Sequence, residues 1–190
     1  MYSETWSKTI FIISDYTLAF NTEIGFFVES RESPPNCSEC GGELAYRDSR
    51  KRILRKEGGE KCWVQIRRFR CKNCGRHHNE LPDCLVPHKH YVTEAIAGVL
   101  DDVVTPEDED SENYPTEQTM IRWKKWFALN KANIEGHLRN IGYSILGLGK
   151  DILIQKDSLL EHLRKQRQDW LERVLRLIYN TGESLRAIPW

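Results

Sequence analysis

The chain has 190 residues, enough for one compact domain or two small ones, and its 28 basic and 28 acidic residues give a net charge of zero. No apolar stretch approaches the roughly 18–20 residues that a membrane-spanning helix needs. The segment after Met1 also lacks the basic start, apolar run and cleavage site of a secretory signal. We therefore expect a cytoplasmic protein without a membrane segment, in a compartment where thiols stay reduced.

The charges are distributed unevenly along the chain. Residues 31–90 hold 14 Lys and Arg against 8 Asp and Glu, and residues 118–176 hold 12 against 6. Between them, residues 101–117 contain eight acidic residues and no basic one. Two basic segments separated by an acidic loop permit local contact with a polyanion, whereas any single charge is more simply a solvated surface group.

The first 34 residues predict a strand followed by a linker region. Residues 9–13 (TIFII) form a β-branched run that ends at Ser14 and Asp15. Residues 33–36 (SPPN) lead into the first of two cysteine motifs.

Two Cys-x-x-Cys-Gly motifs carry the strongest chemical signal. They place the pairs Cys37 and Cys40, and Cys71 and Cys74, on two tight turns, each followed by a glycine that permits positive φ. Four thiolates in two such turns are the donors of a closed tetrahedral Zn²⁺ site. The alternative, a disulfide framework, does not fit a cytosolic chain.

The 30 residues between Cys40 and Cys71 predict an extended hairpin inside a zinc ribbon covering residues 35–90. Short strands are expected at residues 44–46 and 52–54, a turn at Gly58 and Gly59, and a central strand at residues 62–70. On that strand Arg67 and Arg70 are the arginines that we expect to touch nucleic-acid phosphates. Cys62 and Cys84 are interpreted as buried free thiols, and His77 and His78 as alternative metal ligands.

Residues 91–190 predict a helical domain. Thr93 is expected to cap a helix with apolar residues at 96, 100 and 103, the acidic loop 101–117 follows, and Thr116 caps a second helix. That helix buries Met120, Trp123, Phe127 and Ile134 and presents Gln118, Arg122 and Lys125 on its opposite side. A helix-turn-helix unit that reads DNA has this pattern, and so has any small helical bundle.

A capping box at Ser158 and Glu161 predicts a last long helix that ends at Gly182. Its apolar stripe is interpreted as core packing, with dimerisation as the alternative. Together, these elements predict an α+β fold: a small β-rich zinc ribbon followed by a helix-turn-helix-like domain.

The cysteine motifs belong to a longer pattern: residues 66–75 (IRRFRCKNCG), residues 77–82 (HHNELP), residues 85–87 (LVP) and Tyr91. This order resembles an uncharacterised bacterial zinc-ribbon family, which is similar to the N-terminal part of some transposases and occurs in mobile elements and phages. Residues 119–127 and 180–182 resemble later parts of such proteins. The resemblance implies nucleic-acid binding by a ribbon and a helix-turn-helix-like unit, with the four cysteines as metal ligands; the acidic loop departs from the pattern.

The function expected from these features is binding and not catalysis. Four cysteines close the metal shell, the chain has no room for a transposase nuclease domain beside the ribbon, and it contains none of the phosphate-loop, nucleophile-elbow or metalloprotease motifs. The first hypothesis is an accessory or regulatory DNA-binding protein of a mobile element or phage. The second is a protein-binding module or inhibitor whose acidic loop engages a basic nucleic-acid-processing enzyme.

Overall fold

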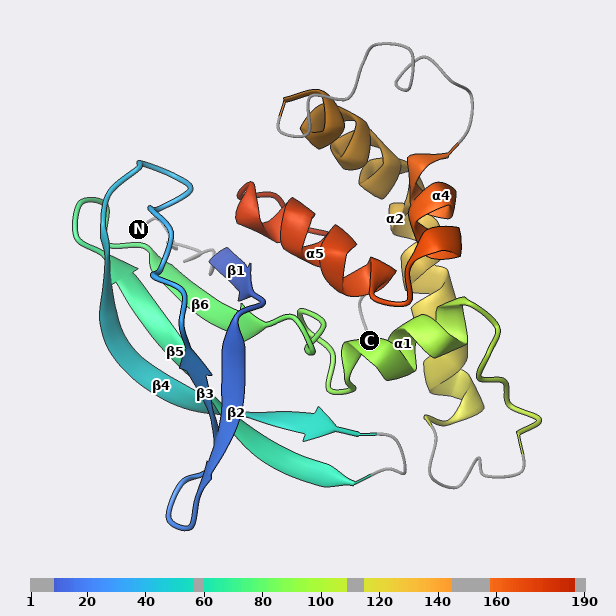
Figure 1. Ribbon diagram of the computed structural model, residues 1–190, viewed down its shortest axis with the longest axis horizontal. Helices are drawn as coiled ribbons and strands as arrows, with labels where there is room; N and C mark the ends of the chain where they lie inside the picture. The colour runs from blue at the N-terminus through green and yellow to red at the C-terminus, as the bar shows by residue number, and fades with distance from the viewer. Residues whose placement is uncertain (1–8, 57–59, 109–114, 145–157, 187–190) are drawn as a thin grey trace, which may run out of the picture.

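The computed structural model describes residues 9–56, 60–108, 115–144 and 158–186. Its strands are β1 (Thr9–Ile13), β2 (Tyr16–Asn21), β3 (Gly25–Ser30), β4 (Leu44–Arg55), β5 (Lys61–Cys71) and β6 (His77–Pro82). Its helices are α1 (Thr93–Leu100), α2 (Glu117–Ser144), α4 (Leu159–Gln166) and α5 (Trp170–Asn180). The fold is α+β, as expected, and Figure 1 shows a sheet on one side with the helices on the other.

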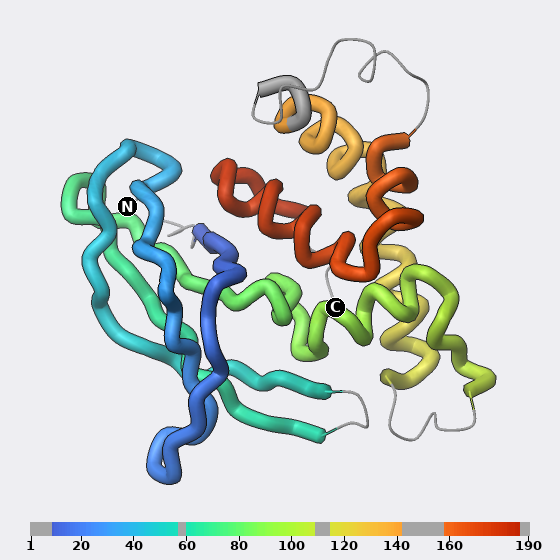
Figure 2. The backbone as a smooth tube through the Cα atoms, in the orientation of Figure 1, coloured from blue at the N-terminus to red at the C-terminus, as the bar shows by residue number. Residues whose placement is uncertain are grey.

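All six strands belong to one curved sheet with the order β1-β6-β5-β3-β2, and β4 lies along the other edge of β5. The long strand β5 is central because three neighbours pair with it: β4 along its whole length, β6 at residues 68–70, and β3 at residues 64 and 65. The path of the chain through this sheet is easiest to follow in Figure 2.

The β4–β5 hairpin differs in one respect from the expected ribbon. The central strand at residues 62–70 is confirmed, but the two short strands expected at residues 44–46 and 52–54 form one continuous strand. A register shift between Tyr46 and Asp48 marks a bulge at Arg47, so the twelve residues of β4 run along the eleven of β5 with Arg47 unpaired in the ladder. The expected turn at Gly58 and Gly59 lies outside the described residues.

The strands of residues 1–34 join the same sheet, so the strands of the expected ribbon do not stand alone. The expected strand at residues 9–13 is confirmed as β1, which runs parallel to β6. β2 and β3, which the sequence analysis did not predict, form an antiparallel hairpin whose β3 pairs with β5. The segment treated as a linker region therefore contributes two further strands, and His77–Pro82, for which no strand was predicted, forms β6.

The side chain of Asn180 closes the free edge of β1. Its Oδ1 accepts a hydrogen bond from the backbone N–H of Ile12 at 2.7 Å, and its Nδ2 donates to the Ile12 carbonyl at 2.8 Å. The amide thus satisfies the two backbone groups that another strand would satisfy. This contact holds the end of α5 against the first strand.

The helix starts follow the sequence signals with one correction. The Ser158 hydroxyl accepts the N–H of Glu161, which confirms Ser158 as the N-cap, while the Glu161 carboxylate pairs with Lys131 and Arg164. Glu135 of α2 accepts the N–H groups of Leu159 and Leu160 at 2.8 and 3.0 Å. Thr93 is not the cap of α1: it is the first helical residue, and its hydroxyl donates to the Asp83 carbonyl at 2.6 Å.

The expected long helix from Ser158 to Gly182 is two helices. α4 ends at Gln166 and α5 begins at Trp170, with Asp169 as its N-cap residue and ion pairs from Asp169 to Arg167 and Arg173. Gly182, at φ 86°, ends α5 as expected. The break lets α4 and α5 pack in different directions against α2, as Figure 1 shows.

One continuous hydrophobic core joins the sheet and the helices. The apolar face expected on α2 is buried at Met120, Trp123, Phe127 and Ile134. On α1, residues 96 and 100 are buried as expected, but Val103 lies beyond the end of the helix and is 75% exposed. Trp170 is 1% exposed and packs edge-to-face on Phe127, with ring centroids 5.5 Å apart. No helix in the described part of the chain is long and apolar enough to cross a membrane.

Candidate metal centre and basic surfaces

The two cysteine motifs fold into matching turns. In the first, Gly41 donates to the Cys37 carbonyl at 2.8 Å; in the second, Gly75 donates to the Cys71 carbonyl at 3.0 Å. Gly41 and Gly75 have φ of 71° and 73°, a region that L side chains rarely adopt, which explains the glycine after each second cysteine. The two turns are therefore the same local structure used twice.

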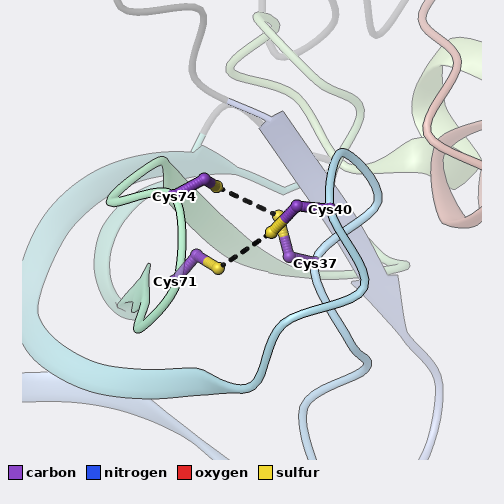
Figure 3. A group of neighbouring side chains, drawn as sticks. All are labelled: Cys37, Cys40, Cys71 and Cys74. Atoms are coloured by element: carbon purple, nitrogen blue, oxygen red, sulfur yellow. Dashed lines mark hydrogen bonds between the residues drawn. The ribbon is translucent and has the colours of Figure 1, made fainter.

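The four sulfurs converge on one point (Figure 3). They all lie within 4.8 Å of one another, with Sγ···Sγ distances of 3.7 Å for Cys37 and Cys74 and 3.5 Å for Cys40 and Cys71. A tetrahedral site with metal–sulfur bonds of about 2.3 Å requires sulfurs about 3.8 Å apart. The cluster can thus hold a metal ion with little movement.

The sheet brings the two turns together. The first turn leads into β4 and the second follows β5, and Leu44 pairs with Cys71 where the hairpin opens. Across the turns, the Lys72 N–H donates to the Glu43 carbonyl at 3.0 Å, and the Lys72–Glu43 and Arg76–Glu39 ion pairs measure 2.8 and 3.2 Å. The protein therefore prearranges its donors through contacts that do not depend on a metal.

The backbone also favours the charged form of one donor. Hydrogen bonds from the backbone N–H groups of Cys74 and Asn73 outweigh the effect of burial and lower the pKa of the Cys71 thiol. The neighbouring Cys40 thiol, hydrogen-bonded to Cys71, has its pKa raised in turn. Thiolates are the form that binds metal. N–H groups directed at sulfur are the usual second shell of such sites.

The other candidate ligands lie outside the cluster. The Nδ1 atom of His78 is hydrogen-bonded to Thr9 Oγ1 at 2.6 Å. The Nε2 atom of His77 lies 2.7 Å from a guanidinium nitrogen of Arg47. Cys62 donates to the Leu54 carbonyl, and burial raises the pKa of the Cys84 thiol to about 11. Among the described residues, the metal-ligand group consists of the four expected cysteines alone.

The two arginines expected to contact nucleic acid have different surroundings. Arg67 makes a bidentate ion pair with Glu80 at 2.7 and 2.6 Å, and the Glu80 carboxylate is buried. Arg70 is exposed and forms no ion pair with a described residue. Arg67 thus has a structural partner, whereas Arg70 faces solvent.

Arg70 borders an open hollow beside the second cysteine turn. The hollow has a volume of about 590 Å³ and is lined by Tyr46, Arg47, Arg70, Lys72 and neighbouring residues of the turn. Tyr46 is 60% exposed, packed edge-to-face on Phe69 with centroids 6.2 Å apart. Three cations and one exposed ring therefore share this surface.

The polar stripe on α2 is exposed as expected: Gln118, Arg122 and Lys125 all face solvent. Of the three, Arg122 also lines a second cavity, formed with Arg55 of β4 and with segment 87–91. No motif in the sequence predicted this cavity. The one pattern that could have indicated it is the run His88-Lys89-His90 directly before Tyr91, since all four residues line the cavity.

The first two carboxylates of the acidic loop are used within the protein. Asp101 accepts from Arg164 at 2.6 Å and from the Trp170 indole at 2.7 Å, and Asp102 pairs with Lys124. These contacts anchor the Asp101–Thr116 connection where it leaves α1. Residues 109–114 lie outside the described residues.

Comparison with known families matches residues 37–123 to the model of a family described as a domain of unknown function, DUF6431. The matched segment begins at the first metal-cluster cysteine, contains all four, and ends inside α2 at Trp123. No curated protein matches the chain. No solved structure matches it either.

Proposed function

We propose that this protein is a zinc-stabilised DNA-binding protein without enzymatic activity, acting as an accessory or regulatory factor of a mobile element or phage. The observation that carries the proposal is the hollow at the second cysteine turn, which Arg47, Arg70 and Lys72 line together with the exposed ring of Tyr46. Lys72 pairs with Glu43 and Arg47 with Asp48, so Arg70 is the cation of this surface without an ion pair to a described residue. Basic side chains neutralise phosphates, and an exposed aromatic ring gives a surface on which a base or sugar packs.

Zinc is the metal that the donor set favours. Four cysteine sulfurs at tetrahedral spacing form a closed structural Zn²⁺ shell, because Zn²⁺ imposes no electronic geometry and accepts thiolates readily. Such a site leaves no coordination position for a substrate. Its role in the proposal is to fix the two turns on which the basic hollow depends.

Helix α2 offers the second DNA contact in this proposal. Gln118 and Lys125 project from its exposed side with Arg122, and side chains of these types donate to base edges and phosphates. The Asp101–Thr116 connection is much longer than the turn of a helix-turn-helix unit, so α1 and α2 would present this side by a different geometry.

The alternative function is protein binding through the acidic loop. The contacts of Asp101 and Asp102 within the protein make this alternative weaker than DNA binding. Their carboxylates already have cationic or N–H partners, which reduces the negative charge that the described part of the loop can offer to a basic protein. It remains one of the outcomes of the test below.

Fluorescence anisotropy with labelled duplex DNA at two salt concentrations tests the proposal on the zinc-loaded full chain. We expect Arg70→Ala to weaken binding to all sequences and to reduce the slope of log K against log salt by about 0.9, the value for one lost phosphate contact. Lys61→Ala is the matched control, since Lys61 is exposed on the same strand but lies outside the hollow.

Zinc content is measured on each variant, because Arg70 packs beside Gly75 of the metal turn. Loss of DNA binding with full zinc content would support the hollow as a contact surface. Identical titrations of wild type, Arg70→Ala and Lys61→Ala would contradict it. Absence of DNA binding even at low salt would favour the protein-partner alternative.

A further inference from the structure

The cavity at the far end of β4 from the cysteine turns has the size of a small-molecule site. It has a volume of about 410 Å³ and lies between Arg55 of β4, segment 87–91, the first turns of α2, and Tyr179 with Leu185. Pockets for small ligands measure about 300–1,000 Å³. In Figure 1 this region lies where the end of β4, the loop before α1 and the start of α2 approach one another.

Positive charge enters this cavity from three elements. Arg55 comes from β4, Lys89 from the loop and Arg122 from α2. His88 and His90 also line the cavity, but burial lowers the pKa of both imidazoles, which favours their neutral form. Among the described residues that line it, none is acidic. Arg55 and Arg122 form no ion pair with any described residue. Burial lowers the pKa of Lys89 to about 8, as expected where a cation lacks a counter-charge. The charge is balanced if the occupant is an anion.

Aromatic rings form the other wall. The Trp123 and Tyr91 rings meet edge-to-face with centroids 4.9 Å apart. The Lys89 ammonium lies 4.3 Å from the centre of the Trp126 ring. Aromatic faces beside basic groups are the combination that binds nucleotides, since a base stacks on the ring while the phosphate meets the cation.

The wall formed by segment 87–91 is held rigidly. The Arg52 guanidinium, partly buried, donates to the Val86 and Lys89 carbonyls at 2.8 and 2.6 Å, and the Arg55 N–H donates to the His90 carbonyl at 2.7 Å. His88 adopts φ 62°, a left-handed conformation that non-glycine residues rarely take and that the surrounding contacts must maintain. These hydrogen bonds hold segment 87–91 in one conformation, so this wall of the cavity is formed without a ligand.

We propose that this cavity binds a nucleoside phosphate, with the base against the Tyr91–Trp123 wall and the phosphate between Arg55 and Arg122. Thr116 and Thr119, at the start of α2, also line the cavity, and their hydroxyls lie 3.1 Å from each other. The nucleoside phosphate is either a free nucleotide or the terminal nucleotide of a strand. The inference goes beyond the proposed function and does not rest on duplex binding at the cysteine turns.

Isothermal titration calorimetry on the zinc-loaded full chain tests the site with four probes: AMP, adenosine, ribose 5-phosphate and phenyl phosphate. We expect AMP to bind at least tenfold more tightly than each of the other three, because it alone carries both a base and a phosphate on a sugar. Quenching of tryptophan fluorescence by AMP, absent with ribose 5-phosphate, would report stacking. Absence of AMP binding, or equal binding of phenyl phosphate, would overturn the proposal.

Arg122→Ala and Arg55→Ala should each weaken AMP binding about tenfold or more, since each removes a charged hydrogen-bond donor. Lys165→Ala, an exposed cation on α4 outside the cavity, is the control and should bind AMP like wild type. Equal affinities of all four proteins would overturn the assignment. Circular dichroism of each variant excludes unfolding as the cause of a loss.

A five-nucleotide strand with and without a 5′-phosphate distinguishes the two sources of the ligand. Tighter binding of the phosphorylated strand than of AMP identifies a strand end, and tighter binding of AMP identifies a free nucleotide. Duplex binding is scored separately through Arg70→Ala, so that failure of the DNA proposal leaves an AMP result standing, and failure of AMP binding leaves a duplex result standing.

Discussion

At the scale of single residues, the buried carboxylate of Glu80 gives Arg67 a structural role as its ion-pair partner. Glu80 is 1% exposed, and its two oxygens accept hydrogen bonds from Arg67. Arg67 was expected to contact DNA because of its place on the central strand. The structure shows a stabilising ion pair for it, and leaves Arg70 as the exposed arginine of that strand.

Arg67→Ala should lower the free energy of unfolding by on the order of 3 kcal/mol, because removing one partner leaves the other charge buried and unpaired. The double variant Arg67→Ala/Glu80→Gln should recover part of this loss, since the neutral amide needs no counter-ion. Urea denaturation of the three proteins measures both effects. A single variant as stable as wild type would show that Glu80 gains another partner.

A second carboxylate makes stability depend on pH. Burial, with the nearby carboxylates of Asp83, Asp169 and Glu94, raises the pKa of Glu172 from 4.5 to about 7. Between these values the folded state binds more protons than the unfolded state, so this group's contribution to stability is lost as pH rises from about 4.5 through 7.

Glu172→Gln removes that loss. The variant should gain stability relative to wild type as pH rises from 5 to 8, and the difference should level off above pH 7. Urea unfolding of both proteins at pH 5, 6, 7 and 8 measures it, and taking differences at each pH cancels the titration of all other groups. A difference independent of pH would contradict the raised pKa.

At the scale of elements, Asn180 replaces a strand at the edge of the sheet. Asn180→Ala would leave the N–H and C=O of the buried Ile12 without their partners, which costs about 2 kcal/mol. Asn180→Asp keeps the acceptor for the N–H but places a carboxylate oxygen against the Ile12 carbonyl, so it should lose stability as well. Amide hydrogen exchange at Ile12 should accelerate in the alanine variant; unchanged exchange there would show that water or another group takes over.

The elements that the sequence predicted are those with a local signal. The β-branched run of β1, the spacing of the cysteines and the helical period of α2 and α5 depend on neighbours in sequence, and all three are confirmed. β6 was missed because its residues His78, Asn79 and Glu80 are polar yet buried, and two of them bind partners that are distant in sequence: His78 contacts Thr9 through Nδ1, and Glu80 accepts from Arg67. No hydrophobic pattern indicates such a strand.

The break between α4 and α5 was missed for the opposite reason. The apolar stripe continues from Leu160 to Ile178 through the break, so periodicity predicts one helix, while the Asp169 contacts that start α5 involve single polar residues. The two sites differ in the same way. The metal cluster could be predicted from two short sequence motifs. The aromatic cavity could not, because its residues come from β4, the loop before α1 and α2, which are distant in sequence.

At the scale of the whole molecule, the cysteine cluster closes one end of the hairpin on which β3 and β6 also pair. Zinc removal should therefore loosen the entire sheet and not a detached ribbon. We expect one zinc per chain, a lower melting temperature after chelation, and loss of zinc in Cys71→Ser. Cys62→Ser, outside the cluster, is the control and should keep its zinc. Zinc retained by Cys71→Ser would contradict the ligand set.

The parallel pairing of β1 with β6, and its closure by Asn180, has a consequence for how the chain folds during synthesis. Asn180 lies 168 residues after Ile12, and at a translation rate of about 5–20 residues per second the two are made about 8–34 s apart. Throughout that interval, the apolar strand Phe11–Ile13 has left the ribosome without its full set of partners. We expect this segment to be a binding site for chaperones on the nascent chain, and the docking of β1 to be among the last steps of folding.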